Sequence, residues 1–208
     1  RGGEKLAHAL SFFNISLIDK IAADLGASTG GFSDCMLQQG IKKIYAIDVG
    51  YNQLAYTLRT DPRIVVYERT HVNKLKSEMF DETVDFVSAD LSFISITKVF
   101  DSIASLFTPC EGIILIKPQF ESSPGEHKKG VVRQKESHIA IIVRVINALM
   151  EKGLTFKGLT YSPIKGPAGN IEFLLYFSLL KNHASQEEEL KIIALNIEKT
   201  VSEAHQNL

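Results

Sequence analysis

The segment Asp24-Leu25-Gly26-Ala27-Ser28-Thr29-Gly30-Gly31-Phe32 is the most informative part of the sequence for the fold. Apolar residues 21–23 precede it, and residues 34–39 follow it with a helical pattern, so the order is strand, glycine-rich turn, helix. Gly26 permits a sharp turn because glycine adopts positive φ without strain. Gly30 and Gly31 leave room for a ligand where the helix starts. Open α/β sheets bind nucleotide-like ligands at such a turn.

The turn alone is also compatible with a tight connection that binds nothing. Ser28 stands where the dinucleotide fingerprint has its second glycine, which argues against a nicotinamide cofactor. The next predicted strand, residues 43–48, ends in Asp48, and a carboxylate at such a position binds a ribose. Asp24 suits a cationic ligand. Together these features favour S-adenosylmethionine, which has a ribose and a sulfonium but no phosphate.

Composition indicates an ordinary globular chain. It has 208 residues, of which 45% are hydrophobic and 23% charged, with a net charge of −1. No apolar run approaches the roughly 18 residues of a membrane span. The two cysteines and six histidines have no disulfide or metal-ligand spacing, so we expect no metal and a reducing, cytoplasmic location. Residues 117–170 hold nine Lys/Arg against four Asp/Glu, which is either a solvated face or a phosphate-contacting rim.

Strands and helices alternate along the chain, which predicts an α/β fold with a doubly wound, mostly parallel sheet. The last two strands are joined by a loop without a helix, so we expect one antiparallel strand. The predicted strands are residues 20–25, 43–48, 64–67, 84–89, 112–116, 154–161 and 171–180. The predicted helices are residues 1–14, 31–39, 50–58, 94–106, 136–152 and 187–205.

Four charged residues stand where such a sheet places its chemistry. Asp90 and Lys117 follow two predicted strands, Glu172 interrupts an apolar strand, and Lys5 lies in the first helix. They are either ordinary capping, rim and surface residues or a catalytic group. Two lysines interleaved with two carboxylates can take the proton of a poorly acidic hydroxyl and stabilise the alkoxide that forms.

Other chemistries fit the residues less well. Cys110 follows Pro109 as in some cytosine methyltransferases, but it precedes the strand that should carry it, so a packing role is favoured. The sequence Asp90-Leu91-Ser92-Phe93 lacks the prolines typical of amino-methyltransferases. Phe93, Phe120 and Tyr161 could stack a base near the site, although core packing is the expectation for Phe93.

With these motifs the chain resembles the TlyA or haemolysin A family of FtsJ-like ribosomal RNA 2′-O-methyltransferases, from residue 1 to about residue 180. The matching motifs are Arg-Gly-Gly-Glu-Lys-Leu at 1–6, the glycine turn at 24–34, Ala-Ile-Asp-Val-Gly-Tyr at 46–51, Arg-Thr at 69–70, Asp-Leu-Ser-Phe-Ile-Ser at 90–95, Lys-Pro-Gln-Phe-Glu at 117–121, Gly-Val-Val-Arg at 130–133 and Gly-Asn-Ile-Glu-Phe-Leu at 169–174.

The resemblance implies a class I, Rossmann-like methyltransferase fold, S-adenosylmethionine as cofactor and a catalytic tetrad of Lys5, Asp90, Lys117 and Glu172. It implies ribosomal RNA or a ribosomal subunit as partner and a cytidine ribose as acceptor. Relatives tend to have Asn where this chain has His71. The implied cofactor-binding residues are Asp24, Gly26, Ser28, Gly30, Gly31, Phe32, Asp48, Val49, His71 and Asp90.

We expect a methyltransferase domain over residues 1–181 and a C-terminal amphipathic helix over residues 182–208. Family members normally carry an S4-like RNA-binding domain before the methyltransferase, and this chain begins where that domain would end. Three alternatives stay open: a membrane-active haemolysin, a nicotinamide-dependent oxidoreductase, and a cofactor- or RNA-binding domain without catalysis.

Overall fold

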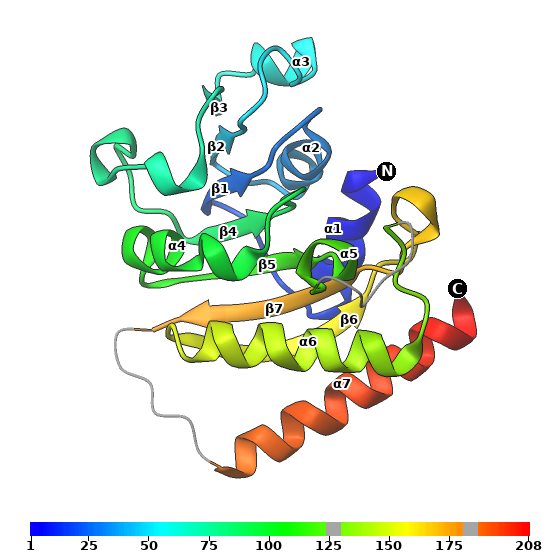
Figure 1. The fold of residues 1–208 in the computed structure, drawn as a ribbon. Coiled ribbons are helices and arrows are strands. Elements are labelled where there is room, and N and C mark those ends of the chain that lie inside the picture. The colour runs from blue at the N-terminus through cyan, green and yellow to red at the C-terminus, as the bar shows by residue number, and fades with distance from the viewer. Residues whose placement is uncertain (124–129, 181–186) are drawn as a thin grey trace.

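The computed structural model describes residues 1–123, 130–180 and 187–208, and its centre is a sheet (Figure 1). Within these residues the sheet has seven strands in the order β3-β2-β1-β4-β5-β7-β6. The strands are β1 (Ile21–Leu25), β2 (Lys43–Ile47), β3 (Ile64–Tyr67), β4 (Phe86–Ala89), β5 (Cys110–Ile116), β6 (Leu154–Tyr161) and β7 (Phe173–Leu179).

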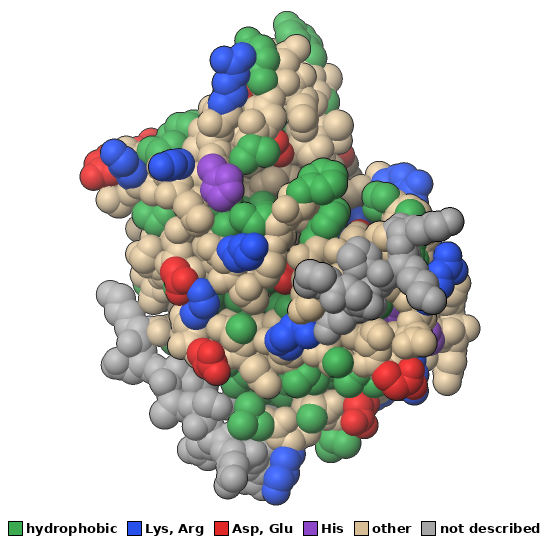
Figure 2. Space-filling view, viewed as in Figure 1, with side chains coloured by type: hydrophobic (Ala, Val, Ile, Leu, Met, Phe, Trp, Pro, Cys, Tyr) green, Lys and Arg blue, Asp and Glu red, His purple; other side chains and the backbone are tan. Residues whose placement is uncertain are grey.

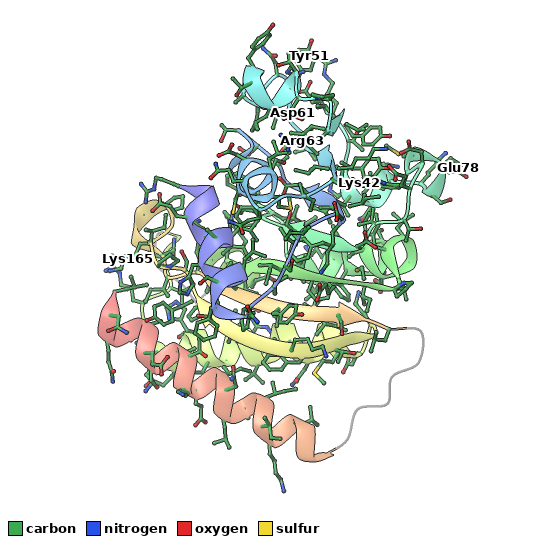
Figure 3. The ribbon with its side chains drawn as sticks, turned by 180° about the vertical axis from the view of Figure 1, so that it is seen from behind. Lys42, Tyr51, Asp61, Arg63, Glu78 and Lys165 are labelled. Atoms are coloured by element: carbon green, nitrogen blue, oxygen red, sulfur yellow. The ribbon has the colours of Figure 1, made fainter. Side chains whose placement is uncertain are left out.

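Helices cover both faces of this sheet. The α-helices are α1 (Gly2–Phe12), α2 (Gly31–Gln38), α3 (Tyr56–Arg59), α4 (Phe100–Phe107), α5 (Pro118–Glu121), α6 (Lys135–Met150) and α7 (Glu187–Asn207). Short 3-10 helices are η1 (Val72–Lys74), η2 (Ser77–Met79), η3 (Ile96–Lys98) and η4 (Pro167–Gly169). Helices α4 and α6 lie on the face seen in Figure 1, whereas α1 and α2 lie on the face seen in Figure 3.

The strand directions confirm the predicted doubly wound sheet. β1 pairs in parallel with β2 and with β4, so the strand order reverses between β1 and β4. β4 and β5 are parallel neighbours, which brings their carboxyl ends to one edge. β7 runs antiparallel to both β5 and β6 and is the predicted antiparallel strand. The start of β7 therefore lies at the same edge as the ends of β4 and β5.

The core has two layers, one on each face of the sheet. β5 contributes to both, since Ile113 and Leu115 pack with α1 and α2 while Ile114 and Ile116 pack with α4 and α6. This alternation within one buried apolar run is typical of a central strand. Gly112 lies where β5 approaches β4 most closely, because a Cβ atom there would be 2.1 Å from the carbonyl oxygen of Val87.

The last helix, α7, packs against α6 and β6. Its buried side chains join the same core as α6. His205 of α7 lies 2.8 Å from His138 of α6 between ring nitrogens, and Thr200 donates a hydrogen bond to the carbonyl of Leu159 in β6. The boundary predicted after residue 181 lies outside the described residues. None of the described helices combines the length and the apolar character that crossing a membrane requires.

Three predicted elements differ from the structure. The helix expected over residues 50–58 is reduced to α3, because Asn52 adopts a left-handed φ of 56° and its N–H bonds to the Glu68 carboxylate. Residues 94–106 form η3 and then α4, with Ser95 capping η3. Glu172 lies one residue before β7 rather than within it.

Candidate active site

The glycine-rich turn after β1 is fixed to the end of β2 by hydrogen bonds. The backbone N–H groups of Gly26 and Ala27 both donate to the carbonyl of Ile47. The Asp48 carboxylate accepts the N–H of Ser28 at 2.7 Å and the N–H of Gly50 at 2.6 Å. Gly26 has a φ of 81°, and a Cβ there would lie 2.5 Å from the Asp90 carbonyl oxygen. Glycine is therefore required both for the turn and for the close approach to the loop after β4.

A cavity of about 450 Å³ lies between this turn and the loops after β2, β3 and β4. Five of the predicted cofactor-binding residues other than Asp90 line it: Gly26, Ser28, Asp48, Val49 and His71. Asp90 lines it as well, and so does Phe93, which the sequence analysis named as a possible base-stacking residue. The other lining residues were not selected as ligand contacts from the sequence: Ile47, Gln53, Thr70, Val72, Leu91, Ser92, Ile94 and Val99.

A second cavity of about 250 Å³ adjoins the first, and the two share Gly26, Ser28, Asp90 and Ser92 as lining residues. All four members of the predicted catalytic tetrad line this second cavity. Gly31 and Phe32, predicted to bind the cofactor, line it too. The described chain thus places a larger chamber and a smaller, charged one side by side, with Asp90 at their junction.

The tetrad forms two ion pairs. Lys117 Nζ lies 2.5 Å from Asp90 Oδ1 and donates a hydrogen bond to Ser92 Oγ at 2.9 Å. Lys5 Nζ lies 2.5 Å from Glu172 Oε2. Lys5 and Lys117 are each 8% exposed, and Glu172 is fully buried. Charged groups are rarely this buried without a partner, which is consistent with their close pairing.

Four separate elements deliver these side chains to one place. Asp90 and Lys117 directly follow the parallel strands β4 and β5, Glu172 directly precedes the antiparallel β7, and Lys5 comes from α1. Helix α1 approaches closely because glycines meet there: a Cβ on Gly31 would lie 3.1 Å from Gly2 Cα. The parallel pairing of β4 with β5 brings Asp90 and Lys117 together.

Two carboxylate oxygens of the tetrad have no hydrogen-bond partner among the described residues: Asp90 Oδ1, which is ion-paired with Lys117, and Glu172 Oε1. Glu172 Oε1 is buried, while its neighbour Oε2 is paired with Lys5. The loop between β6 and β7 closes over this carboxylate, and a Cβ on Gly166 would lie 2.2 Å from Oε1. Figure 3 shows this loop, marked by Lys165, beside the start of α1, where Arg1 donates to the Lys165 carbonyl. Glu172 lines the smaller cavity, and leaving a buried acceptor such as Oε1 without a partner is costly.

Asp24 lies apart from both cavities in the part of the chain that the structure describes. Its side chain is fully buried, and it accepts hydrogen bonds from Ser33 Oγ at 2.6 Å and Ser88 Oγ at 2.9 Å. Burial raises the pKa of this carboxyl to about 6, and the charge of Asp90 adds to the rise while the two serines oppose it. Asp24 therefore sits behind the glycine turn, and a cofactor contact by it stays a prediction.

Replacing Asp24 with asparagine will remove a pH dependence of stability between about pH 4 and pH 6. The pKa of Asp24 is raised from 3.8 to about 6 in the folded chain, so folded protein binds this proton more tightly than unfolded protein. Its contribution to the free energy of unfolding therefore decreases as the pH rises through this window and is constant above it. At about 1.4 kcal/mol per pKa unit, the raised pKa lowers the free energy of unfolding at neutral pH by about 3 kcal/mol.

The measurement is urea unfolding of both proteins from pH 4 to pH 7.5. We expect the free energy of unfolding of the Asp24→Asn variant to increase relative to that of the wild type as the pH rises. Subtracting the two curves of unfolding free energy against pH removes the contribution of groups that titrate in both proteins. One such group is His138, whose pKa is lowered to about 4, mainly by burial and secondarily by His205. A difference that does not change with pH would contradict the assigned shift.

Gly30 also lines neither cavity within the described residues. It has a φ of 98°, and a Cβ there would lie 2.1 Å from Leu58 Cδ1 and 2.8 Å from Leu54 Cδ1. The glycine thus lets the turn pack against α3 and the segment before it. Its predicted cofactor contact stays a prediction.

The sequence analysis expected Phe93 to pack in the core, and this expectation is wrong. Its side chain is 90% exposed, and its backbone has a positive φ of 64°. Its ring lies 5.0 Å from that of Phe120, between centroids, at the wall of the larger cavity. Ser92, which sequence reasoning did not select, contacts Lys117. The only available signal for both residues was their place directly after Asp90.

Comparison with known proteins agrees with this geometry. The sequence model of the FtsJ-like methyltransferase family matches residues 1–179. Hemolysin A of Brachyspira hyodysenteriae is 45% identical over 180 residues, covering 85% of this chain and 75% of that protein. The 16S/23S rRNA (cytidine-2′-O)-methyltransferase TlyA of Mycobacterium tuberculosis is 38% identical over 193 residues, covering 92% of this chain and 72% of that protein.

A solved structure from Streptococcus thermophilus, described as a hemolysin, is similar to this one. It superposes with a TM-score of 0.93 at 37% identity and covers all of this chain, which in turn covers 74% of that chain. The family match spans every strand of the sheet and all four tetrad positions. The predicted family and fold are confirmed: this chain belongs to the FtsJ-like methyltransferase family.

Proposed function

We propose that this chain transfers the methyl group of S-adenosylmethionine to the 2′-hydroxyl of a ribose in ribosomal RNA. The observation that carries the proposal is the junction of the two cavities. The larger one has the ribose-binding acid Asp48, and the smaller one has two lysine–carboxylate pairs, with Asp90 lining both. The curated relatives named as rRNA cytidine-2′-O-methyltransferases support RNA and a cytidine ribose as acceptor.

The larger cavity fits the cofactor by size and by chemistry. Its volume of about 450 Å³ is in the range of small-molecule sites. Asp48 would accept the ribose hydroxyls, and Val49 and His71 would flank the adenine. Gly26, Ser28, Gly31 and Phe32 would line the path of the amino-acid part, while Asp24 and Gly30 would support the turn from behind. When bound, S-adenosylmethionine supplies an electrophilic methyl group on a sulfonium.

The tetrad would prepare the acceptor hydroxyl. Lys117, held between Asp90 and Ser92, would take or steer the proton of the acceptor hydroxyl. Lys5 stabilises the negative charge that develops on the oxygen, and Glu172 holds Lys5 in place. Because the reaction is a direct displacement, alignment of oxygen, carbon and sulfur supplies much of the acceleration.

Features around the cavities favour an RNA acceptor. The exposed Phe93 ring, backed by Phe120, offers a face on which a base could stack at the cavity wall. Among the described residues on the face shown in Figure 2, basic and acidic side chains are interspersed with exposed hydrophobic ones rather than gathered in one basic patch. This agrees with the net charge of −1, which does not favour general electrostatic attraction to nucleic acid.

We further propose that residues 1–181 form the catalytic unit, that residues 182–208 are its C-terminal helical extension, and that the protein acts in the cytoplasm. The other functions have less support. A haemolytic activity would rest on the names of relatives. A binding domain without catalysis would not need two buried ion pairs in a cavity, and a nicotinamide cofactor would lack the second glycine of its fingerprint.

Calorimetric titration of this chain with S-adenosylmethionine, and with NADH as the control, tests the cofactor. We expect micromolar binding of the former alone. Incubation with labelled cofactor and ribosomal subunits then tests the acceptor. The label should appear in nucleotides that resist alkaline cleavage, because 2′-O-methylation removes the attacking hydroxyl. Binding of NADH alone, or a methyl group on a base, would contradict the proposal.

A further inference from the structure

Glu121 links the two loops that carry the Lys117–Asp90 pair. It ends α5, the single turn that starts directly after Lys117. Its Oε1 accepts the N–H of Ile96 at 2.9 Å, and its Oε2 accepts the hydroxyl of Ser95 at 2.5 Å. Both oxygens of one carboxylate are thus bonded to the start of η3, 25 residues earlier in the chain.

The residues bonded to Glu121 close the loop that begins at Asp90. At its first end this loop is fixed to the sheet, because the Asp90 N–H donates to the Leu25 carbonyl. Its middle is not anchored by burial, since Ser92 and Phe93 are exposed, and Phe93 has a left-handed backbone. A non-glycine residue keeps such a conformation only when its surroundings hold it. The Glu121 carboxylate contacts the second end at Ser95 and Ile96, which the burial of Ile96 and a hydrogen bond from Lys152 to the Thr97 carbonyl also hold.

The α5 side of this contact is itself firmly held. The Phe120 N–H donates to the Lys117 carbonyl at 2.8 Å, and an Arg144 guanidinium nitrogen donates to the Glu121 carbonyl at 3.0 Å. Burial raises the pKa of Glu121, whereas Ser95, Ile96, Arg144 and Lys98 oppose the rise. The carboxylate is therefore a desolvated group whose hydrogen bonds to η3 are costly to lose.

We propose that Glu121 is a positioning residue that sets the distance between Asp90 and Lys117 by joining the loop after β4 to the segment after β5. The catalytic consequence rests on the proposed function, but the contact between the Glu121 carboxylate and the start of η3, which we call the Glu121 clamp, is a property of the fold. Glu121 touches neither cavity among the described residues and acts through the residues that do. A displacement of about 1 Å in a reacting group can cost 10²-fold in rate.

The test compares Glu121→Ala with the isosteric Glu121→Gln. Glutamine keeps both contacts, because its amide oxygen can accept the Ile96 N–H and its NH₂ can donate to Ser95 Oγ. We expect Glu121→Ala to lower kcat by 10- to 100-fold, with the KM for RNA changed less than threefold, and Glu121→Gln to restore kcat to within threefold of wild type. A hydrogen-exchange experiment should show at least tenfold faster exchange of residues 90–96 in the alanine variant only.

Asp85→Ala is the matched control. Asp85 likewise accepts a backbone N–H, that of Ile21 at 3.0 Å, but at the opposite end of the sheet. Its loss should lower the melting temperature as Glu121→Ala does and leave kcat unchanged. Unaltered exchange in residues 90–96, unaltered kcat in Glu121→Ala, or a glutamine variant as slow as the alanine one would each overturn the proposal. If the wild type transfers no methyl group, the proposed function fails, and the exchange data alone decide on the clamp.

Discussion

Replacing Lys117 with alanine will lower the rate of methyl transfer about 10³-fold while leaving the affinity for S-adenosylmethionine within about threefold of wild type. Lys117 Nζ is within 3 Å of both Asp90 Oδ1 and Ser92 Oγ, at 2.5 and 2.9 Å, in the smaller cavity. Positioned acid–base groups contribute roughly 10²–10⁴ in rate. Lys117 does not line the larger cavity, so cofactor binding has no reason to depend on it.

Single-turnover methylation of ribosomal subunits, with calorimetry for the cofactor, measures both quantities. Lys43→Ala is the control, because Lys43 is also a partly buried lysine whose Nζ lies 2.6 Å from a carboxylate, that of Asp81, at the start of β2. It should methylate at the wild-type rate. Full activity in Lys117→Ala would mean that the hydroxyl proton leaves by another route, and the assignment of the tetrad would fail.

The largest loss of stability is expected for Gly112→Ala, at least about 3 kcal/mol in the free energy of unfolding. An added Cβ would lie 2.1 Å from the Val87 carbonyl oxygen and 2.8 Å from the Phe177 ring. Overpacking of a core costs roughly 1–3 kcal/mol when side chains can adjust. Here the nearest atom is backbone in the β4–β5 pairing, so the two strands themselves must separate.

Urea unfolding followed by circular dichroism measures this effect. Gly153→Ala is the informative control, because Gly153 has a φ of 96° but open space around its Cβ position. Gly153→Ala should lower the free energy of unfolding by only roughly 1–2 kcal/mol, which is the cost of placing alanine in a left-handed conformation. If the free energy of unfolding of Gly112→Ala is within about 1 kcal/mol of the wild-type value, the β4–β5 contact is less tight than the distances indicate.

The elements that the sequence predicts well are those determined by local pattern. The apolar run ending at Ile116 and the glycine turn after Leu25 define the strands and their order, because burial on both faces requires a central position. The helix expected after Gly50 fails because one residue, Asn52, is held left-handed by a bond to Glu68, which lies 16 residues away. A contact of that kind leaves no local pattern.

The same distinction applies to the site. Asp90, Lys117 and Glu172 could be selected because charged residues next to apolar strands are unusual. Phe93 could not be placed, because its exposure depends on how the loop after β4 is held. Asp24 is a motif residue whose carboxylate is buried and accepts hydrogen bonds from Ser33 and Ser88, which come from different elements.

The pair of Lys5 and Glu172 joins residues 167 positions apart. During synthesis, Lys5 emerges well before Glu172. Because β7 inserts between β5 and β6, the sheet cannot be completed before both of its neighbours exist. A nascent or partly folded chain therefore has the glycine turn but not the tetrad. The four tetrad residues would therefore come together only after contacts between distant parts of the chain have formed, and such contacts form slowly.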